Sequence, residues 1–414
     1  MIFKYFFIII STIINLYTQD LVLSWKKIYD SGKHDNPIEI VTDKYGNIYI
    51  AGQTGLPNNY DLLVIKYDSS GNLKWVKTYD SGSHDLGYAI ALSENGNLYV
   101  AGQISNSSSG WDYMLLKYDT SGNFYWCSNY NWSPLDGAYA VEVDNNENIY
   151  LFGQSSNISS HKADYILLKL DSNGNKIWES TYRKGITFAD SYGLALDKFS
   201  SNSFIYVSGY TTNDFLVIKY STNGNRLWAK RFDESILDFG MGITIDREHN
   251  FYLTGSSYNT AFSQYNLVLI KGDSNGNLIW KKRLDSTKGE MGFDLVERDG
   301  YIYVSGSANN GLNDDFLFLK FDTLGNLLWR IIYDTGSQNK GYGIAMDNTG
   351  NIYITGYTLN LNYDALTLKY QKFSEQSESS FKKSPVKPPQ LHFGIGKGII
   401  KKIKELKGKI EQEE

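Results

Sequence analysis

One pattern returns about every 50 residues along most of this chain, and it constrains the fold more than any other feature. A Tyr-x-x-Gly tetrad, a Trp and a Lys each recur in the same phase. The tetrads begin at Tyr49, Tyr99, Tyr150, Tyr206, Tyr252, Tyr303 and Tyr353. The tryptophans are Trp25, Trp75, Trp126, Trp178, Trp228, Trp280 and Trp329, and the lysines are Lys66, Lys117, Lys169, Lys219, Lys271, Lys320 and Lys369. The sequence therefore predicts one repeated unit, although 414 residues alone would suggest two or three domains.

Each unit contains four short runs with the composition of β-strands. In the second copy these runs are residues 88–92, 98–102, 113–118 and 124–130. Turns such as residues 43–47 and 68–72 join them, with an Asp that can bind backbone amides and a Gly that can adopt positive φ. Four antiparallel strands in each of seven units predict an all-β fold, a seven-bladed β-propeller. A β-helix or open solenoid is the alternative, disfavoured because its coils are shorter and its strands parallel.

The two ends of the repeat are complementary. Trp25 lies on a fourth-type strand, residues 22–29, that precedes the first unit, and the last unit stops at Tyr370 after its third strand. Pairing residues 22–29 with residues 365–370 would complete the last blade and cover two strand edges. We therefore predict a propeller closed by its N-terminal strand.

The repeat resembles the bacterial SBBP β-propeller repeat, from about residue 22 to residue 370. The residues that carry the resemblance run Asp43-x-x-Gly46-Asn47-Ile48-Tyr49-Ile50-Ala51-Gly52 and then Asp61-x-x-x-x-Lys66-Tyr67-Asp68-x-x-Gly71-Asn72-x-x-Trp75. The resemblance implies a secreted or surface-exposed bacterial protein without an assigned catalytic activity. Three copies depart from the turn pattern, at Glu147, at residues 199–203 and at residues 299–301.

Composition divides the chain into four parts. Residues 1–18 have one early cation and an apolar run too short to span a bilayer, which predicts a signal peptide and a secreted, periplasmic or cell-surface location. The propeller is expected over residues 19–370 and a flexible linker rich in Pro, Lys and Ser over 371–398. Residues 399–414 predict a short basic amphipathic helix or a disordered tail, which would allow weak contact with a membrane surface or a partner.

Charge and motif content exclude several functions. The net charge of −5 combines a tail (371–414) of +4, from 10 Lys and 6 Glu, with a body of −9, which argues against nucleic-acid binding. The five histidines have no zinc-site spacing, there is one Cys, and no nucleophile-elbow motif occurs, so we expect no metal and no cofactor. His34 and His84 are equivalent in the repeat, which favours a scaffold role. We expect a monomer.

Loop lengths indicate which face binds. The third-to-fourth turns have constant length, whereas the second-to-third loops on the opposite rim vary, and variable loops on a rigid scaffold commonly bind ligands. We expect an unknown protein or glycan ligand to contact the aromatic residues of that rim. The binding candidates are Tyr60, Trp111, Trp132, Tyr258 and Tyr265. The alternative is that these side chains simply fold over the strand ends.

A set of carboxylates provides the second group of candidates. Four occupy one equivalent position before the innermost strand and would ring one mouth of the central channel as a cation site: Asp35, Asp85, Asp136 and Asp238. The alternative is that each caps its own turn. Asp190 lies one residue out of step, and Asn339 takes this position in the last copy.

Non-repeated carboxylates are better candidates for function. Glu39, Glu142 and Asp294 replace small or neutral residues on innermost strands and are expected near the channel mouth. The repeated Lys residues, six of them five positions after an Asp, are predicted to form ion pairs within the scaffold. The sequence thus favours a non-catalytic binding module, with no catalytic residue assigned. The alternative is a carbohydrate-active hydrolase or lyase that uses Glu39, Glu142 or Asp294 as acid and base.

Overall fold

The structure of the protein, a computed structural model, describes residues 21–157, 162–186, 191–199, 203–211 and 213–372. These residues form β-strands and turns and contain no helix, so the all-β prediction is confirmed. The predicted signal peptide (1–18), the tail (399–414) and the linker beyond its first two residues lie outside the described residues, as do Asp190 and His161.

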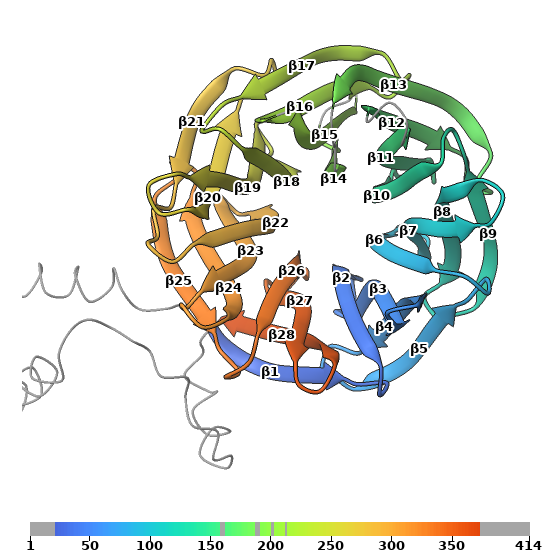
Figure 1. Ribbon diagram of the computed structural model, residues 1–414, viewed down its shortest axis with the longest axis horizontal. Helices are drawn as coiled ribbons and strands as arrows, with labels where there is room; N and C mark the ends of the chain where they lie inside the picture. Colours follow the sequence, from blue (N-terminus) through green and yellow to red (C-terminus); the bar gives the residue numbers. More distant parts are fainter. Residues whose placement is uncertain (1–20, 158–161, 187–190, 200–202, 212, 373–414) are drawn as a thin grey trace, which may run out of the picture. The chain divides into compact units, whose positions relative to one another are not determined.

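The strands fall into four radial positions around a common centre (Figure 1). The innermost are β2 (His34–Thr42), β6 (Asp85–Leu92), β10 (Leu135–Val143), β14 (Ser191–Asp197), β18 (Asp238–Ile245), β22 (Glu290–Arg298) and β26 (Asn339–Met346). The second are β3 (Ile48–Leu56), β7 (Asn97–Asn106), β11 (Ile149–Asn157), β15 (Phe204–Thr211), β19 (Phe251–Asn259), β23 (Tyr301–Asn309) and β27 (Ile352–Leu359).

The third strands are β4 (Asn59–Tyr67), β8 (Gly110–Asp119), β12 (Lys162–Leu170), β16 (Asp214–Ser221), β20 (Gln264–Gly272), β24 (Asp314–Asp322) and β28 (Tyr363–Lys372). The outermost are β1 (Leu21–Tyr29), β5 (Leu73–Tyr79), β9 (Phe124–Tyr130), β13 (Lys176–Ile186), β17 (Arg226–Phe232), β21 (Leu278–Arg283) and β25 (Leu327–Tyr333).

Strands pair in antiparallel sets of four. Four sheets contain consecutive strands, β2–β5, β14–β17, β18–β21 and β22–β25. An eight-stranded sheet joins β6–β9 to β10–β13 through a single parallel pair, Leu135 with Trp111. The sixth sheet has the order β1-β28-β27-β26 and so combines the two ends of the described chain.

The pairing of the N-terminal strand with the last repeat is confirmed. Strand β1 runs antiparallel to β28, with Tyr29 opposite Ala365 and Val22 opposite Gln371. Leu21 is buried against the core of this sheet, and the Trp25 ring lies 6.0 Å from the ring of Tyr353. The first strand of the described residues is therefore the outermost strand of the sheet that contains their last strand.

The repeated turns form as their composition predicts. In the turn between β4 and β5, Asp68 Oδ1 accepts hydrogen bonds from the backbone N–H groups of Ser70 (3.0 Å) and Asn72 (2.9 Å), while Gly71 adopts a φ of 78°. Where the third copy lacks the Gly, Glu147 takes the positive φ itself, at 61°. Its carboxylate also accepts a hydrogen bond from Tyr99 Oη at 2.8 Å, so the altered turn gains a contact to the neighbouring repeat.

The core lies between neighbouring sheets. One cluster combines Tyr49 and Leu62 of the β2–β5 sheet with Ile90 and Leu98 of the β6–β9 set. Innermost strands also contact one another in sequence, from β2 through β6, β10, β14, β18 and β22 to β26, and β26 contacts β2. Each sheet is thus held on both faces by its neighbours, and the innermost strands surround a central space (Figure 1).

Candidate functional site

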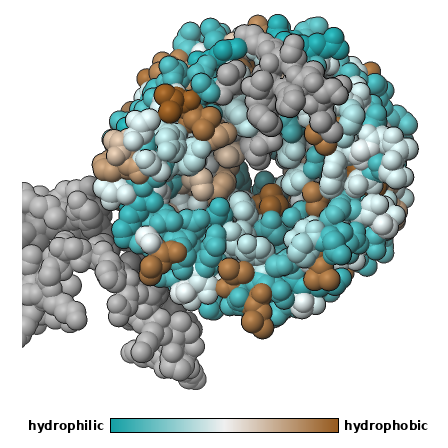
Figure 2. All heavy atoms as spheres, in the orientation of Figure 1, coloured by the Kyte–Doolittle hydropathy of each residue, from teal (hydrophilic) through white to brown (hydrophobic). Residues whose placement is uncertain are grey.

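The innermost strands line a central cavity of about 940 Å³. Its wall is mostly Ala, Gly, Ile, Leu and Val, with few charged side chains: Glu39, Glu142, Lys198, Asp294 and Glu297. On the face shown in Figure 2 the molecule is hollowed at its centre, and hydrophobic residues elsewhere on that face form small separate groups. Glu39, Glu142 and Asp294, which were expected near the channel mouth, are part of this lining.

Glu39 and Asp294 occupy equivalent places on β2 and β22. Each follows a β-bulge, after Pro37 and Gly292 respectively, and bulges re-aim side chains at such points. Strand β26 contacts both β2 and β22 and contributes Gly343 to this layer. A Cβ on Gly343 would lie 2.9 Å from Glu39 Cα and 3.1 Å from its Oε1, so a larger residue would collide with this carboxylate.

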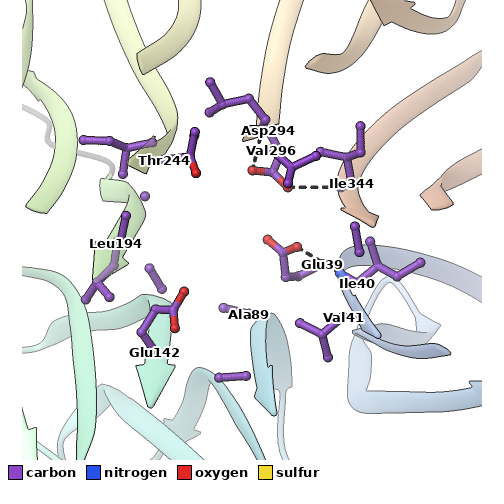
Figure 3. Close-up of a pocket in the computed structure, with 18 of the residues that line it drawn as sticks. Glu39, Ile40, Val41, Ala89, Glu142, Leu194, Thr244, Asp294, Val296 and Ile344 are labelled. Carbon is purple, nitrogen blue, oxygen red and sulfur yellow. Dashed lines mark hydrogen bonds between the residues drawn. The ribbon is translucent and has the colours of Figure 1, made fainter. Parts of the chain in front are cut away.

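The two carboxylates face one another across the cavity wall (Figure 3). Asp294 Oδ1 accepts a hydrogen bond from the N–H of Leu295 at 2.7 Å, and Oδ2 accepts one from Ile344 at 3.0 Å. Glu39 Oε1 accepts from the N–H of Ile40 at 2.9 Å. Burial raises the pKa of Asp294 to about 6, and burial together with the negative charge of Asp294 raises the pKa of Glu39 well above its usual value.

Glu142 has a different environment from this pair. It lies on β10, on another side of the cavity (Figure 3). Its carboxylate accepts a hydrogen bond from Lys198 Nζ at 3.2 Å. Lys198 thus compensates its charge, whereas Glu39 and Asp294 have no cation at this distance among the described residues. The cavity therefore offers one carboxyl pair suited to holding a proton and one separate ion pair. Among the described residues, no group of three His, Cys, Asp or Glu side chains could hold a metal ion.

The four repeated Asp residues do not ring a channel mouth, which corrects that prediction. Asp35, Asp85, Asp136 and Asp238 are each 0% exposed and lie outside the cavity lining. Asp136 Oδ2, for example, accepts hydrogen bonds from the N–H groups of Trp132 (2.6 Å) and Ser133 (2.9 Å). The alternative interpretation, a cap on the turn that enters each innermost strand, accounts for their positions. Burial raises the pKa of Asp85, Asp136 and Asp238 although these hydrogen bonds oppose it.

Two further polar residues occupy the equivalent position at the start of an innermost strand. Asn339 Oδ1 accepts a hydrogen bond from Thr335 Oγ1 at 2.7 Å. Glu290, which the sequence analysis missed, is buried and forms an ion pair with Arg330 of the same sheet. The sequence position of Glu290 could have identified it, because it lies at the start of an innermost strand and every strand of this type begins near a polar side chain.

Two predicted aromatic candidates belong to one row of rings on the variable rim. We call this row the rim arc: Tyr363, His34, Tyr60, His84 and Trp111. Successive ring centres are 5.1, 6.5, 6.1 and 5.8 Å apart, and all five side chains are half-buried. The arc crosses three neighbouring sheets, from β28 through β2 and β4 to β6 and β8.

The histidines are fixed in this arc by hydrogen bonds between sheets. His84 Nδ1 accepts from the N–H of Tyr60 at 3.2 Å, and His34 Nδ1 accepts from the N–H of Tyr363 at 3.3 Å. The expectation of a scaffold role for both histidines is therefore supported. The sequence analysis missed Tyr363, although it precedes an Asp, as do Tyr60 and Trp111.

The other aromatic candidates lie in separate groups. Trp132 packs edge-on against Tyr113, with ring centres 5.0 Å apart. Tyr258 and Tyr265 contact one another at 5.2 Å, and Tyr265 contacts Phe239 at 5.6 Å. The structure thus brings together Tyr60 and Trp111 and does not join the remaining three candidates to them.

The repeated Lys and Trp residues connect neighbouring sheets. A predicted ion pair is found at Lys271, whose Nζ lies 3.4 Å from Asp246 Oδ2, and other copies of the Lys contact backbone carbonyls. Lys66 Nζ and Trp75 Nε1 both donate to the carbonyl of Thr120 in the next sheet, at 2.7 and 3.3 Å. Lys66 also lies 4.9 Å from the centre of the Tyr49 ring. Carbonyl and aromatic acceptors suit a half-buried ammonium group without adding a second buried charge.

The same contact joins strands β1 and β28 to the first repeat. Trp25 Nε1 and Lys369 Nζ both donate to the carbonyl of Ser69, at 3.4 and 2.9 Å. Ser69 lies in the turn between β4 and β5, so the sheet that contains β1 and β28 is fastened to the β2–β5 sheet.

Several solved structures are similar to this chain. YCF48, solved with D1 peptide, has a TM-score of 0.54 and 10% identity, over 86% of this chain and 96% of that one. The β-propeller domain of the Trilobed protease from Pyrococcus furiosus has a TM-score of 0.48 and 9% identity, over 85% and 99%. An acylaminoacyl peptidase from Pyrococcus horikoshii has a TM-score of 0.47 and 9% sequence identity. The similarity covers 86% of this chain but 54% of that one. The chain spans about half the length of that peptidase.

Sequence comparison identifies the repeat itself. No curated protein matches this chain. No helix in the described part of the chain is long and apolar enough to cross a membrane. The family model of the SBBP β-propeller repeat matches residues 24–60 and 330–364, within the first and last repeats. The first and last repeats of the chain thus match the SBBP β-propeller repeat, and the same residues recur in phase between these two matches.

Proposed function

We propose that this protein is a closed, seven-bladed propeller that acts as a non-catalytic binding module through its variable rim. Seven blades correspond to the seven sets of four strands, with β1 completing the blade of β26, β27 and β28. The ring of contacts among innermost strands and the Trp25 and Lys369 contacts to Ser69 support closure. A cryo-electron microscopy or crystal structure checks the blade number.

The observation that carries the binding function is the rim arc. Aromatic rings tend to be covered when they serve only as packing, whereas these five form a continuous row of half-buried rings across three blades. Large amphipathic rings supply contact area at small entropic cost, which suits a glycan or a peptide. Because the arc stands on strand ends fixed by hydrogen bonds between blades, it is pre-organised for a ligand.

Glycan and peptide arrays with the mature protein test this function. Trp111→Ala and Tyr60→Ala should each weaken binding at least tenfold, while Tyr45→Ala, an exposed aromatic on another turn, should not change it. Binding that survives both arc substitutions, or no binding to either array, would contradict the proposal. Unchanged melting temperatures in the variants show that the loss is local.

We further propose a secreted, periplasmic or cell-surface location and a monomeric state. The leader-like composition of residues 1–18 supports the location. Fractionation of expressing cells and mass spectrometry of the exported chain test it, and sedimentation tests the oligomeric state. The basic tail is proposed to add weak contact with an anionic surface, which sedimentation with anionic vesicles tests.

A carbohydrate-active hydrolase or lyase remains the second candidate, because one observation favours it. Glu39 and Asp294 face one another in the cavity with raised pKa values, and acid–base catalysis commonly uses such carboxyl pairs. Turnover of a polysaccharide that disappears in both Glu39→Gln and Asp294→Asn, but not in Trp111→Ala, would establish this function in place of rim binding.

A further inference from the structure

The rim arc has an internal repeat that bears on its ligand. Tyr363, Tyr60 and Trp111 occupy the same position in three successive blades, each directly before an Asp. His34 and His84 occupy another equivalent position, each directly before a capping Asp. Along the arc, the three Tyr or Trp rings therefore alternate with the two imidazoles, and the pattern advances by one blade at each Tyr or Trp ring.

The hydrogen bonds determine the form of the two imidazoles. In each ring Nδ1 accepts a backbone N–H, from Tyr363 in one case and from Tyr60 in the other. A nitrogen that accepts a hydrogen bond carries no proton, so the proton of the neutral ring resides on Nε2. His34 and His84 each therefore present an Nε2–H donor.

These two donors are available to a ligand. Among the described residues neither Nε2 has a hydrogen-bond partner, and neither belongs to the buried polar atoms that lack one. A donor that is unpaired and not buried faces solvent. Two N–H donors thus alternate with three aromatic rings along the same rim.

The surrounding groups indicate which ligand fits. The three aromatic residues are followed by Asp364, Asp61 and Asp112, and the nearby turns contribute Asp30 and Asp80, while the Lys33 charge acts on Asp61. This negative charge disfavours anionic ligands such as uronic-acid polymers or nucleic acid. Asp112 and Asp364 are buried, so the exposed carboxylates of Asp30 and Asp80 are the acidic acceptors near the arc. Together with the ring faces and the N–H donors, they match the hydroxyl groups and apolar faces of neutral sugars.

An extended peptide fits less well. Peptides that bind at strand ends use free backbone N–H and C=O groups. Here the N–H groups of Tyr60 and Tyr363 already donate to His84 and His34. The groups still free to bind a ligand are the side-chain N–H donors and the aromatic rings. A ligand without a peptide backbone, such as a sugar, can use these groups.

From this pattern, and resting on the proposed rim-binding function, we propose that the arc binds a neutral oligosaccharide in two equivalent subsites. Sugar faces lie against Tyr363, Tyr60 and Trp111. His34 and His84 donate from Nε2 to sugar oxygens, one in each subsite. A chain long enough to reach both subsites binds more tightly than a disaccharide.

The test titrates the mature protein with cellohexaose, xylohexaose, mannohexaose and chitohexaose, with the matching disaccharides and with an oligogalacturonate hexamer. At least one neutral hexamer should bind, more tightly than its disaccharide, and the anionic hexamer should bind least. His34→Asn and His84→Asn keep an amide oxygen where Nδ1 accepts and remove the outward donor. Each should weaken hexamer binding about 2- to 12-fold, which corresponds to one hydrogen bond, and should reduce the advantage of the hexamer over the disaccharide.

Each other result has a defined meaning. Neutral binding that His34→Asn and His84→Asn leave unchanged overturns the assigned donors. Binding of peptides alone, lost in Tyr60→Ala and Trp111→Ala, overturns the oligosaccharide ligand but keeps the rim-binding function. No binding of any probe overturns both. Tyr45→Ala serves as the surface control, and His34→Ala, which also loses the contact to Tyr363, shows the effect of loosening the rim.

Discussion

The carboxyl pair in the central cavity makes the stability of this protein depend on pH in a specific direction. Burial raises the pKa of Asp294 to about 6 from an ordinary value of 3.8, and that of Glu39 is also raised. An acid with a raised pKa in the folded state binds its proton more tightly there than in the unfolded chain. Its stabilising contribution is therefore complete below pH 3.8 and is lost as pH rises through about 6.

The magnitude follows from the shift. About two pKa units at Asp294 correspond to at most about 3 kcal/mol of unfolding free energy lost between pH 4 and pH 8, and ionisation of Glu39 adds to this loss. Glu39→Gln removes one of the two ionisations. The Gln carbonyl can still accept from the N–H of Ile40.

We expect Glu39→Gln to raise the free energy of unfolding at pH 8 by about 1–3 kcal/mol and to change it little at pH 4.5. Urea unfolding at both pH values measures this difference. Glu142→Gln is the matched control, because it breaks the ion pair with Lys198 and should give no gain at pH 8. A Glu39→Gln protein that loses as much stability as the wild type between pH 4.5 and 8 would refute the reasoning.

Three further predictions concern the scaffold. Trp75→Phe keeps most of the ring and loses the hydrogen bond to Thr120, so it should cost about 0.5–1.5 kcal/mol in urea unfolding; no change would show that the bond is dispensable. Asp136→Ala leaves two turn amides without an acceptor and should cost about 2–4 kcal/mol, whereas Asp136→Asn should cost less, since Asn339 fills the equivalent position; equal costs would contradict the capping role. Deleting residues 21–29 removes Leu21 and the Trp25 contact and should lower the melting temperature by more than about 10 °C, and an unchanged melting curve would exclude closure by β1.

The repeat made the fold predictable, because strand order and turn type follow from residues that recur in phase. Pairing of β1 with β28 could be predicted for the same reason, since the missing strand at one end matched the extra strand at the other. Contacts between repeats were harder to predict from the sequence. Lys66 points to a carbonyl of the next blade, which linear spacing from Asp61 could not indicate.

The candidate site was predictable only in part. Glu39 and Asp294 stood out because they differ from the small residues at their position, and the structure brings them together. From the sequence, Asp136 and its equivalents could be interpreted either as a cation-binding ring at the channel mouth or as caps on their own turns. Their complete burial distinguishes the two interpretations. The rim arc could not be derived from sequence, because the contact of His84 with Tyr60 and Trp111 depends on how neighbouring blades meet.

A crystal structure of the protein with its tightest-binding neutral oligosaccharide tests the central claim most directly. The account predicts sugar rings against Tyr60 and Trp111, with His34 and His84 Nε2 about 2.7–3.2 Å from sugar oxygens and an empty central cavity. An oligosaccharide bound in the cavity beside Glu39 and Asp294, with the rim arc unoccupied, would contradict it.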